Sequence, residues 1–410
     1  MNGWLIFILV AIGAKYVLDL VVSLLNLKAL SPQLPGEFRG VFNEEKYRES
    51  QEYTRTNTLF SIVQNSCVTI VTLTFLLWGG FNVVDQFARS FAFGEIITGI
   101  IFTAILLLLS FALELPFSIY HTFVIEEKFG FNRTTVKTFL LDILKGAALA
   151  SILGAPILAL VIWFFLASGE LAWVYCWIGV FSITLVLQFL APVLIMPLFN
   201  KFTPLEDGEL KDAIMKYTSR ERFTIKGVFV MDGSKRSTKL NAFFTGFGRF
   251  KKIVFFDTLL ETLNTQQIIG VLAHEMGHYK HKHLLKMITA SFLQTGLMFF
   301  FLSLIINNHG LFAAFSMTDV SVYASLVFFG FLYAPVSLLL SIIFNAFSRK
   351  HEFEADRYAA HSTNEPRFLI EGLKILSKKN LSNLTPHPLN VFLHYSHPPV
   401  LQRIKALREV

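Results

Sequence analysis

The chain has 410 residues, of which 53% are hydrophobic and 16% are charged, whereas soluble globular proteins carry about 25% charged residues. Its formal net charge of +7 is modest and lies in particular loops, and no RNA- or DNA-binding motif accompanies it. These features exclude an ordinary soluble protein and a nucleic-acid-binding protein, and they predict that the lipid bilayer is a partner of this chain.

Seven apolar segments are long enough to cross a membrane, which takes about 20 apolar residues in a helix. The last of them contains Pro335, which a membrane helix tolerates as a kink. The predicted spans are residues 3–25, 60–84, 96–120, 139–167, 172–198, 287–307 and 320–346. The sequence therefore predicts an α-helical integral membrane protein with seven transmembrane helices.

Basic residues alternate between the connecting loops. The first, third and fifth loops and the C-terminal tail contain several Lys and Arg residues, the second loop contains only Arg89, and the fourth and sixth contain none. By the positive-inside rule, the N-terminus is outside or lumenal and the C-terminus is cytosolic. A bacterial inner membrane and an endoplasmic reticulum membrane both remain open.

Charged residues also occur inside the predicted spans, where they are costly and usually face a cavity or each other. Two pairs have helical spacing and can pair locally, namely Lys15 with Asp19 and Asp142 with Lys145, whereas Glu114 has no such neighbour. A polar interior that holds water would explain all five.

Two cytosolic parts follow from these spans. We divide the chain into residues 1–198 (spans one to five with their loops), 199–286 (cytosolic loop), 287–346 (spans six and seven) and 347–410 (cytosolic tail). Together the two cytosolic parts predict a small α+β unit.

Within the cytosolic loop, residues 225–233, 241–247 and 251–260 are typical of short strands. The pattern becomes helical at Asn264, and Gln267 stands in the capping-box position three residues later. The tail is predicted to continue as a helix over 348–360, then a further helix, then a segment rich in Pro and His.

The predicted helix carries the pattern HExxH within "VLAHEMGHYKHKH" (271–283). His274 and His278 are four residues apart, so they share one helix face and can hold one Zn²⁺. Glu275 points beside the metal and suits a general base that takes a proton from the attacking water. The alternative is a chance string in a juxtamembrane helix rich in His and Lys.

A catalytic zinc usually needs a third protein ligand. His281 and His283 are local candidates, but we interpret them as solvated helix-end residues, because a helix does not easily bring a third donor round the ion from the same surface. Glu352 is the better candidate, with Asp356 one turn later to orient a ligating histidine. Taken alone, that segment also fits an ordinary charged helix.

Nearly the whole chain resembles the type I CAAX prenyl protease family, which are integral-membrane zinc metalloproteases. The similar stretches are residues 34–55, 125–135, 197–211, 234–261, "HEMGHYKH" (274–281), "NAFSRKHEFEADRYA" (345–359) and "HYSHPPVLQRI" (394–404). HExxH is shared by many zinc proteases, whereas its combination with the long stretch before it and the EFEAD segment is much more specific. The resemblance implies seven helices around a large intramembrane chamber, with the catalytic site near its cytosolic end.

The resemblance also implies roles for individual residues. Glu352 matches the third ligand of one Zn²⁺ per chain. His397 and Arg403 match positions that hold the peptide or the developing oxyanion. Asn241 matches a peptide-binding position, and the strand that continues through Ala242 and Phe243 can bind substrate by strand addition or serve as a plain edge strand.

The implied activity is release of the C-terminal tripeptide from prenylated CAAX proteins or peptides. One rival is a membrane quality-control protease that cleaves unprenylated peptides, and prenylated and unmodified peptides would distinguish the two. The other rival is a transporter or structural membrane protein with an inactive metal motif, which zinc stoichiometry and a peptidase assay would exclude.

Overall fold

Seven long apolar helices form the larger part of the molecule. The computed structural model describes residues 2–245 and 252–410. Within these residues, seven helical segments are long and apolar enough to cross a membrane: α1 (Gly3–Lys28), α2 (Glu44–Leu77), α4–η2–α5 (Glu95–Lys128), α6–η3–α7 (Val136–Ala167), η4–α8–η5–α9 (Gly169–Phe199), α13 (His283–Ser303) and α15 (Val322–Thr363). This confirms the predicted helical membrane protein with seven spans.

The second span differs from its prediction at both ends. α2 begins in the first loop at Glu44, where the Asn43 side chain accepts a hydrogen bond from the backbone N–H of Lys46. It ends at Leu77 because Gly79 adopts φ 78°, a left-handed conformation that costs glycine little. The predicted residues beyond that point belong to a separate helix, α3 (Gly80–Arg89).

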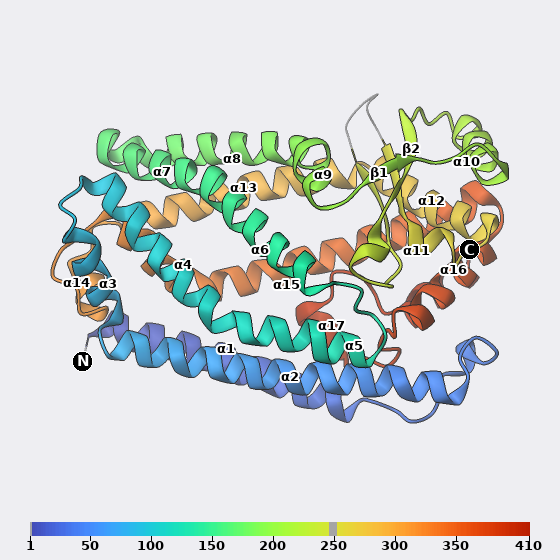
Figure 1. Cartoon of the computed structure of the whole chain (residues 1–410), viewed down its shortest axis with the longest axis horizontal. Coiled ribbons are helices and arrows are strands. Elements are labelled where there is room, and N and C mark those ends of the chain that lie inside the picture. The colour runs from blue at the N-terminus through green and yellow to red at the C-terminus, as the bar shows by residue number, and fades with distance from the viewer. Residues whose placement is uncertain (1, 246–251) are drawn as a thin grey trace.

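The seventh span continues without interruption into the tail. α15 runs through Pro335 and on to Thr363, so the predicted boundary between residues 346 and 348 does not exist. Glu352 and Asp356 therefore stand on the same helix as the membrane span, and this helix crosses the whole length of the molecule (Figure 1).

A small mixed sheet lies beside the end of the membrane helices. Its strands are β1 (Phe202–Pro204), β2 (Gly227–Met231), β3 (Ala242–Thr245) and β4 (Lys252–Phe256), in the order β1-β2-β4-β3. β2 and β4 are parallel, and β1 and β3 pair antiparallel with them. β3 is therefore an edge strand.

Three of these strands lie within predicted segments. Of the predicted strand 241–247, residues 246 and 247 are outside the described residues, as is residue 251 of the third segment. The prediction for 257–260 is wrong, because these residues form a helical turn, α11 (Asp257–Leu260). β1 and the helix α10 (Glu209–Arg220) were not anticipated.

Short helices complete the part outside the membrane spans and the loops. They are α12 (Thr265–Lys280), α14 (His309–Ala314), α16 (Pro366–Lys379), α17 (Pro388–His394) and α18 (Val400–Arg408), with short turns at η1 (Gly36–Phe38) and η6 (Gly233–Lys235). α12 packs against both α15 and α16 around a buried apolar core that includes Leu272 and Met276. This apolar core thus holds α12 in place beside α15.

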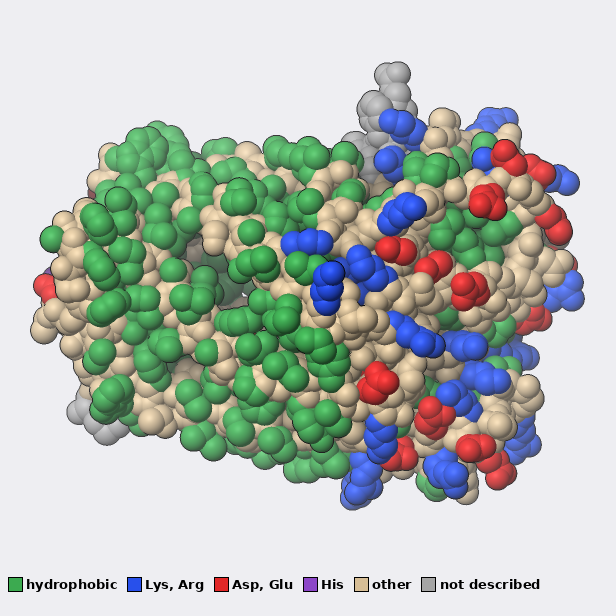
Figure 2. Space-filling view, in the orientation of Figure 1, with side chains coloured by type: hydrophobic (Ala, Val, Ile, Leu, Met, Phe, Trp, Pro, Cys, Tyr) green, Lys and Arg blue, Asp and Glu red, His purple; other side chains and the backbone are tan. Residues whose placement is uncertain are grey.

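The membrane helices surround an open interior. In the most apolar stretch of each span only 0–17% of residues are buried within the protein. Apolar side chains cover the end of the molecule that the membrane helices form, and the surface there is hollowed (Figure 2). Charged side chains gather at the opposite end.

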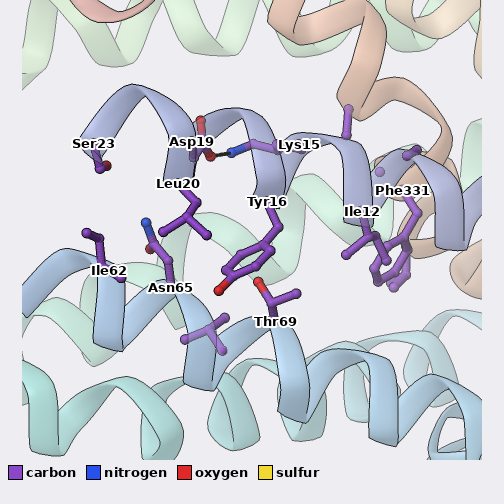
Figure 3. Close-up of a pocket in the computed structure, with 15 residues that line it drawn as sticks. Ile12, Lys15, Tyr16, Asp19, Leu20, Ser23, Ile62, Asn65, Thr69 and Phe331 are labelled. Carbon is purple, nitrogen blue, oxygen red and sulfur yellow. Dashed lines mark hydrogen bonds and ion pairs between the residues drawn. The ribbon is translucent and has the colours of Figure 1, made fainter. Parts of the chain in front are cut away.

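A cavity of about 490 Å³ lies between α1, α2 and α15. Polar side chains enter it from two helices, including Tyr16 from α1 and Asn65 from α2 (Figure 3). Lys15 and Asp19 line it and form the predicted ion pair, at 2.5 Å.

The second predicted pair does not form. Asp142 accepts two hydrogen bonds from Arg236, at 2.7 and 2.8 Å, while Lys145 donates to the backbone carbonyl of Leu198. Arg236 comes from the long loop between the fifth and sixth spans, so this pair joins the fourth span to that loop.

Candidate metal centre

The HExxH helix begins as the sequence predicts. The Asn264 side chain accepts a hydrogen bond from the N–H of Gln267, whose side chain accepts one from the N–H of Asn264. This confirms the capping box, which satisfies two otherwise unpaired donors. From this start, α12 places His274 and His278 one turn apart on the same face, and their Nε2 atoms lie 3.2 Å from each other.

Close packing brings a carboxylate to these histidines. A Cβ atom on Gly277 would lie 2.8 Å from the Cα of Ala355, so glycine is what lets α12 approach α15. Glu352 then lies with Oε1 3.2 Å from His278 Nε2 and Oε2 3.5 Å from His274 Nε2. The close approach at Gly277 is therefore a contact between the two helices.

A second carboxylate lies behind the first histidine. Asp356 Oδ1 is 2.8 Å from Nδ1 of His274. Arg403 is buried and donates two hydrogen bonds to Asp356, at 2.6 and 2.8 Å, and its Nη1 lies 3.3 Å from Glu352 Oε2. The guanidinium group thus contacts both carboxylates on the outer side of His274, a place that suits positioning better than contact with substrate.

Glu275 stands next to the histidines on α12. Burial raises the pKa of its carboxyl above the ordinary value for glutamate. A carboxylate with a raised pKa is a stronger base, which fits the abstraction of a proton near neutral pH.

His397 approaches from the C-terminal segment. Its Nε2 lies 3.4 Å from Glu352 Oε1, while 66% of its side chain is exposed. Arg349 on α15 donates to the backbone carbonyls of Val391 and Tyr395, at 3.1 and 2.6 Å, and so fixes the segment that carries it. An exposed imidazole beside the cluster is accessible to a bound peptide.

The donor set fits a divalent metal ion. One donor atom from each of His274, His278 and Glu352 lies within 4.8 Å of the other two. In the part of the chain that the structure describes, Oε2 of Glu352 is buried and accepts no hydrogen bond. The site holds three carboxylates, on Glu275, Glu352 and Asp356, and one guanidinium group, on Arg403. Two negative charges therefore remain if the imidazoles are neutral. Two imidazoles and a carboxylate are a typical ligand set for catalytic zinc.

The interpretation of His283 as a solvated residue is wrong. α12 ends at Lys280, and Lys282 adopts φ 56°, so α13 starts at His283 after a sharp turn. His283 is consequently buried, and its Nδ1 lies 3.0 Å from Nδ1 of His278. Helical periodicity could not reveal this contact, because it depends on the left-handed residue; His281 remains exposed, as expected.

Asn241 precedes the edge strand β3. Its side-chain oxygen accepts a hydrogen bond from the N–H of Ala242, and its carbonyl accepts one from Phe256 on β4. α12 contacts β3, so this edge lies close to the helix that carries the histidines.

The seven apolar helices and the site described here define the protein as an integral-membrane metallopeptidase. Residues 23–201 match the CAAX prenyl protease N-terminal model, described as five membrane helices, and residues 204–410 match the model of peptidase family M48. The chain belongs to the CAAX prenyl protease family within the M48 peptidases, which confirms the resemblance seen in the sequence.

Individual relatives align along nearly the full length. The chain is 36% identical to a CAAX prenyl protease 1 homolog of Arabidopsis thaliana, with 96% of this chain and 94% of the relative covered. It is 33% identical to CAAX prenyl protease 1 of Saccharomyces cerevisiae, with 93% and 89% covered. The crystal structure of S. mikatae Ste24p superposes with a TM-score of 0.94 at 33% identity, covering 99% of both chains.

Proposed function

We propose that this protein is a zinc endopeptidase that releases the C-terminal tripeptide from prenylated CAAX proteins or peptides. The observation that carries the proposal is the convergence of His274, His278 and Glu352 next to Glu275, where the membrane helices meet the cytosolic part. The relatives named for CAAX prenyl protease activity supply the substrate class.

His274, His278 and Glu352 would hold one zinc ion per chain. A zinc ion in such a site acts as a Lewis acid on the scissile carbonyl and makes a water molecule more acidic. Asp356 accepts the Nδ1 proton of His274, which keeps Nε2 of that ring free to bind metal. Arg403 positions Asp356 and Glu352, and we assign it no direct contact with substrate.

Glu275 would move the proton during hydrolysis. Its carboxylate takes a proton from the attacking water, whose oxygen bonds to the scissile carbonyl carbon. When the C–N bond breaks, the same carboxyl passes that proton to the leaving amine. His397, which is exposed beside Glu352, is placed to donate a hydrogen bond to the developing oxyanion.

The edge of β3 would hold the peptide by strand addition. Phe256 N–H bonds the carbonyl of Asn241, and hydrogen-bonded and non-bonded pairs alternate along an antiparallel ladder. The backbone N–H and C=O groups of Phe243 therefore point toward β4. Those of Ala242 and Phe244 point to the free edge of the sheet. Substrate peptides that are N-methylated at one residue each test this. KM should rise only for peptides methylated at a residue whose N–H pairs with β3.

The lipid of a prenylated substrate requires an apolar route to the site. The membrane helix α13 starts three residues after α12 ends. The other membrane helix, α15, carries both Glu352 and the cavity-lining residues Val327 and Phe331. Transfer of a lipid chain into an apolar environment is worth about 0.8 kcal/mol per CH₂. We therefore expect prenylation to increase substrate affinity.

A pair of matched peptides tests the proposal. The purified protein, in detergent or lipid with zinc, should release the last three residues of a farnesylated CAAX peptide faster than those of its unprenylated twin. Equal rates would favour the quality-control alternative. Failure to cleave either peptide while zinc is bound would reject this substrate class.

A further inference from the structure

A second group of metal-binding side chains lies beside the proposed zinc site. It consists of His281, His283 and Glu354, and one donor atom from each lies within 4.8 Å of the other two. Nε2 of His283 is 2.9 Å from Oε2 of Glu354, and the rings of His281 and His283 stack at 5.5 Å with an angle of 14° between them. None of these three residues is needed to hold the first ion.

The three residues extend from a buried histidine to an exposed one. The side chain of His283 is 4% exposed and that of Glu354 is 27% exposed, while His281 lies on the surface. On the inner side, the ring of His351 stacks on His283 at 4.0 Å and supports it. An ion can thus reach the group from the cytosolic surface and find one ligand already fixed in place.

The surrounding charges allow a cation. Lys286 and Lys350 each lie 3.9 Å from the Glu354 carboxylate, with 53% and 71% of their side chains exposed, and the exposed Lys280 and Lys282 flank His281. Such exposed ion pairs are weak and give way readily. Two imidazoles with one carboxylate favour zinc and similar transition metals over magnesium or calcium, which prefer oxygen ligands.

We propose that His281, His283 and Glu354 form a second site for zinc or a related divalent transition metal, and that its occupation opposes metal binding at the first site. The site itself stands on the three residues alone, whereas the opposition rests on the proposed function of His278.

Hydrogen bonding between the two sites explains the opposition. His278 can bind metal through Nε2 only if its proton is on Nδ1, which then donates to Nδ1 of His283, 3.0 Å away. His283 must in turn carry its proton on Nε2, and it donates that proton to Glu354.

A metal ion on Nε2 of His283 would reverse this order. The Nε2 proton leaves to solvent and Nδ1 takes up a proton from solvent, so that His283 changes tautomer and stays neutral. Two N–H groups would then face each other between His283 and His278. His278 relieves this conflict by moving its own proton to Nε2, which removes it from the first metal.

Zinc titration of the purified full-length protein tests both parts. We expect one tightly held zinc per chain and a second equivalent at higher zinc concentration, measured by equilibrium dialysis and elemental analysis. Turnover of the farnesylated peptide should fall as the second equivalent binds. A limit of one zinc per chain at every concentration would overturn the second site.

Variants assign the second equivalent. His281→Ala should keep the first zinc, lose the second and escape inhibition by excess zinc. Glu354→Gln should also lose the second equivalent, since its amide still accepts the His283 hydrogen bond but is a poor ligand. His361→Ala, an exposed histidine further along α15, is the matched control and should bind as the wild type does.

The binding and activity measurements test the two parts of the proposal separately. If both variants retain the second zinc, the site is wrong. If the second zinc binds and is lost in the variants, but does not lower turnover or displace the first zinc, the opposition is wrong. An inactive protein would reject the proposed function, while the stoichiometry would still decide the second site.

Discussion

Glu275 is the residue on which turnover should depend most directly. Glu275→Gln keeps the shape of the side chain but cannot accept the proton, so we expect the variant to retain its metal and to lose a factor of roughly 10²–10⁴ in kcat. Metal analysis and peptide cleavage should be measured on the same preparation. Glu261→Gln, which changes an exposed glutamate before α12, is the control and should keep both metal and turnover. Wild-type kcat in Glu275→Gln would contradict the assignment of the base.

Glu352 and Asp356 should differ in their effect on metal binding. Glu352→Ala removes one of the three proposed ligands and should lose the metal or hold it far more weakly. Asp356→Asn should lower affinity by about 10- to 100-fold, as expected for a partner of a ligating histidine.

Chelator competition measures these affinities, with His281→Ala as the variant that should retain the tightly bound ion. If His281→Ala loses that ion while Glu352→Ala keeps it, the tight site is the local histidine group.

At the scale of whole elements, the approach of α12 to α15 decides whether the metal centre assembles. Gly277→Ala would place a methyl group 2.8 Å from the backbone of Ala355. Overpacking of this kind typically costs about 1–3 kcal/mol. We therefore expect lower thermal stability and weaker metal binding in Gly277→Ala, although every ligand is still present.

A glycine on the long partner helix, α15, supplies the control. A Cβ on Gly330 would have no heavy atom within 4 Å of it, so Gly330→Ala should leave the melting temperature and metal affinity unchanged. Equal behaviour of the two variants would mean that the close contact at Gly277 does not govern the site.

At the scale of the whole molecule, the orientation in the membrane determines which compartment contains the site. The charge pattern of the loops places residue 168 outside and residue 234 in the cytosol. In a background without Cys67 and Cys176, we expect Ser168→Cys to react with an impermeant thiol reagent from outside. Ser234→Cys should react only after the membrane is opened.

The opposite labelling pattern would reverse the orientation. It would also place His274 and His278 in the compartment where cytosolic CAAX substrates are absent. Labelling of the parent without cysteines measures the background, so the two positions can be compared directly.

Features that depend only on residues close together in the sequence could be predicted from it. The seven spans follow from stretches of about 20 apolar residues, and the capping box follows from Asn264 and Gln267 standing three apart. His274 and His278 share a face because of the helical repeat alone. Such local features need no knowledge of the remaining chain, since the helix itself supplies the geometry.

The contacts that complete the site required the tertiary structure. Glu352 reaches the histidines only because Gly277 allows α12 to pack closely on α15, and Asp142 pairs with Arg236 because a distant loop lies against its helix. His283 turns inward because Lys282 adopts a left-handed conformation. These outcomes depend on packing between segments far apart in sequence and on one unusual backbone angle, neither of which hydropathy or periodicity encodes.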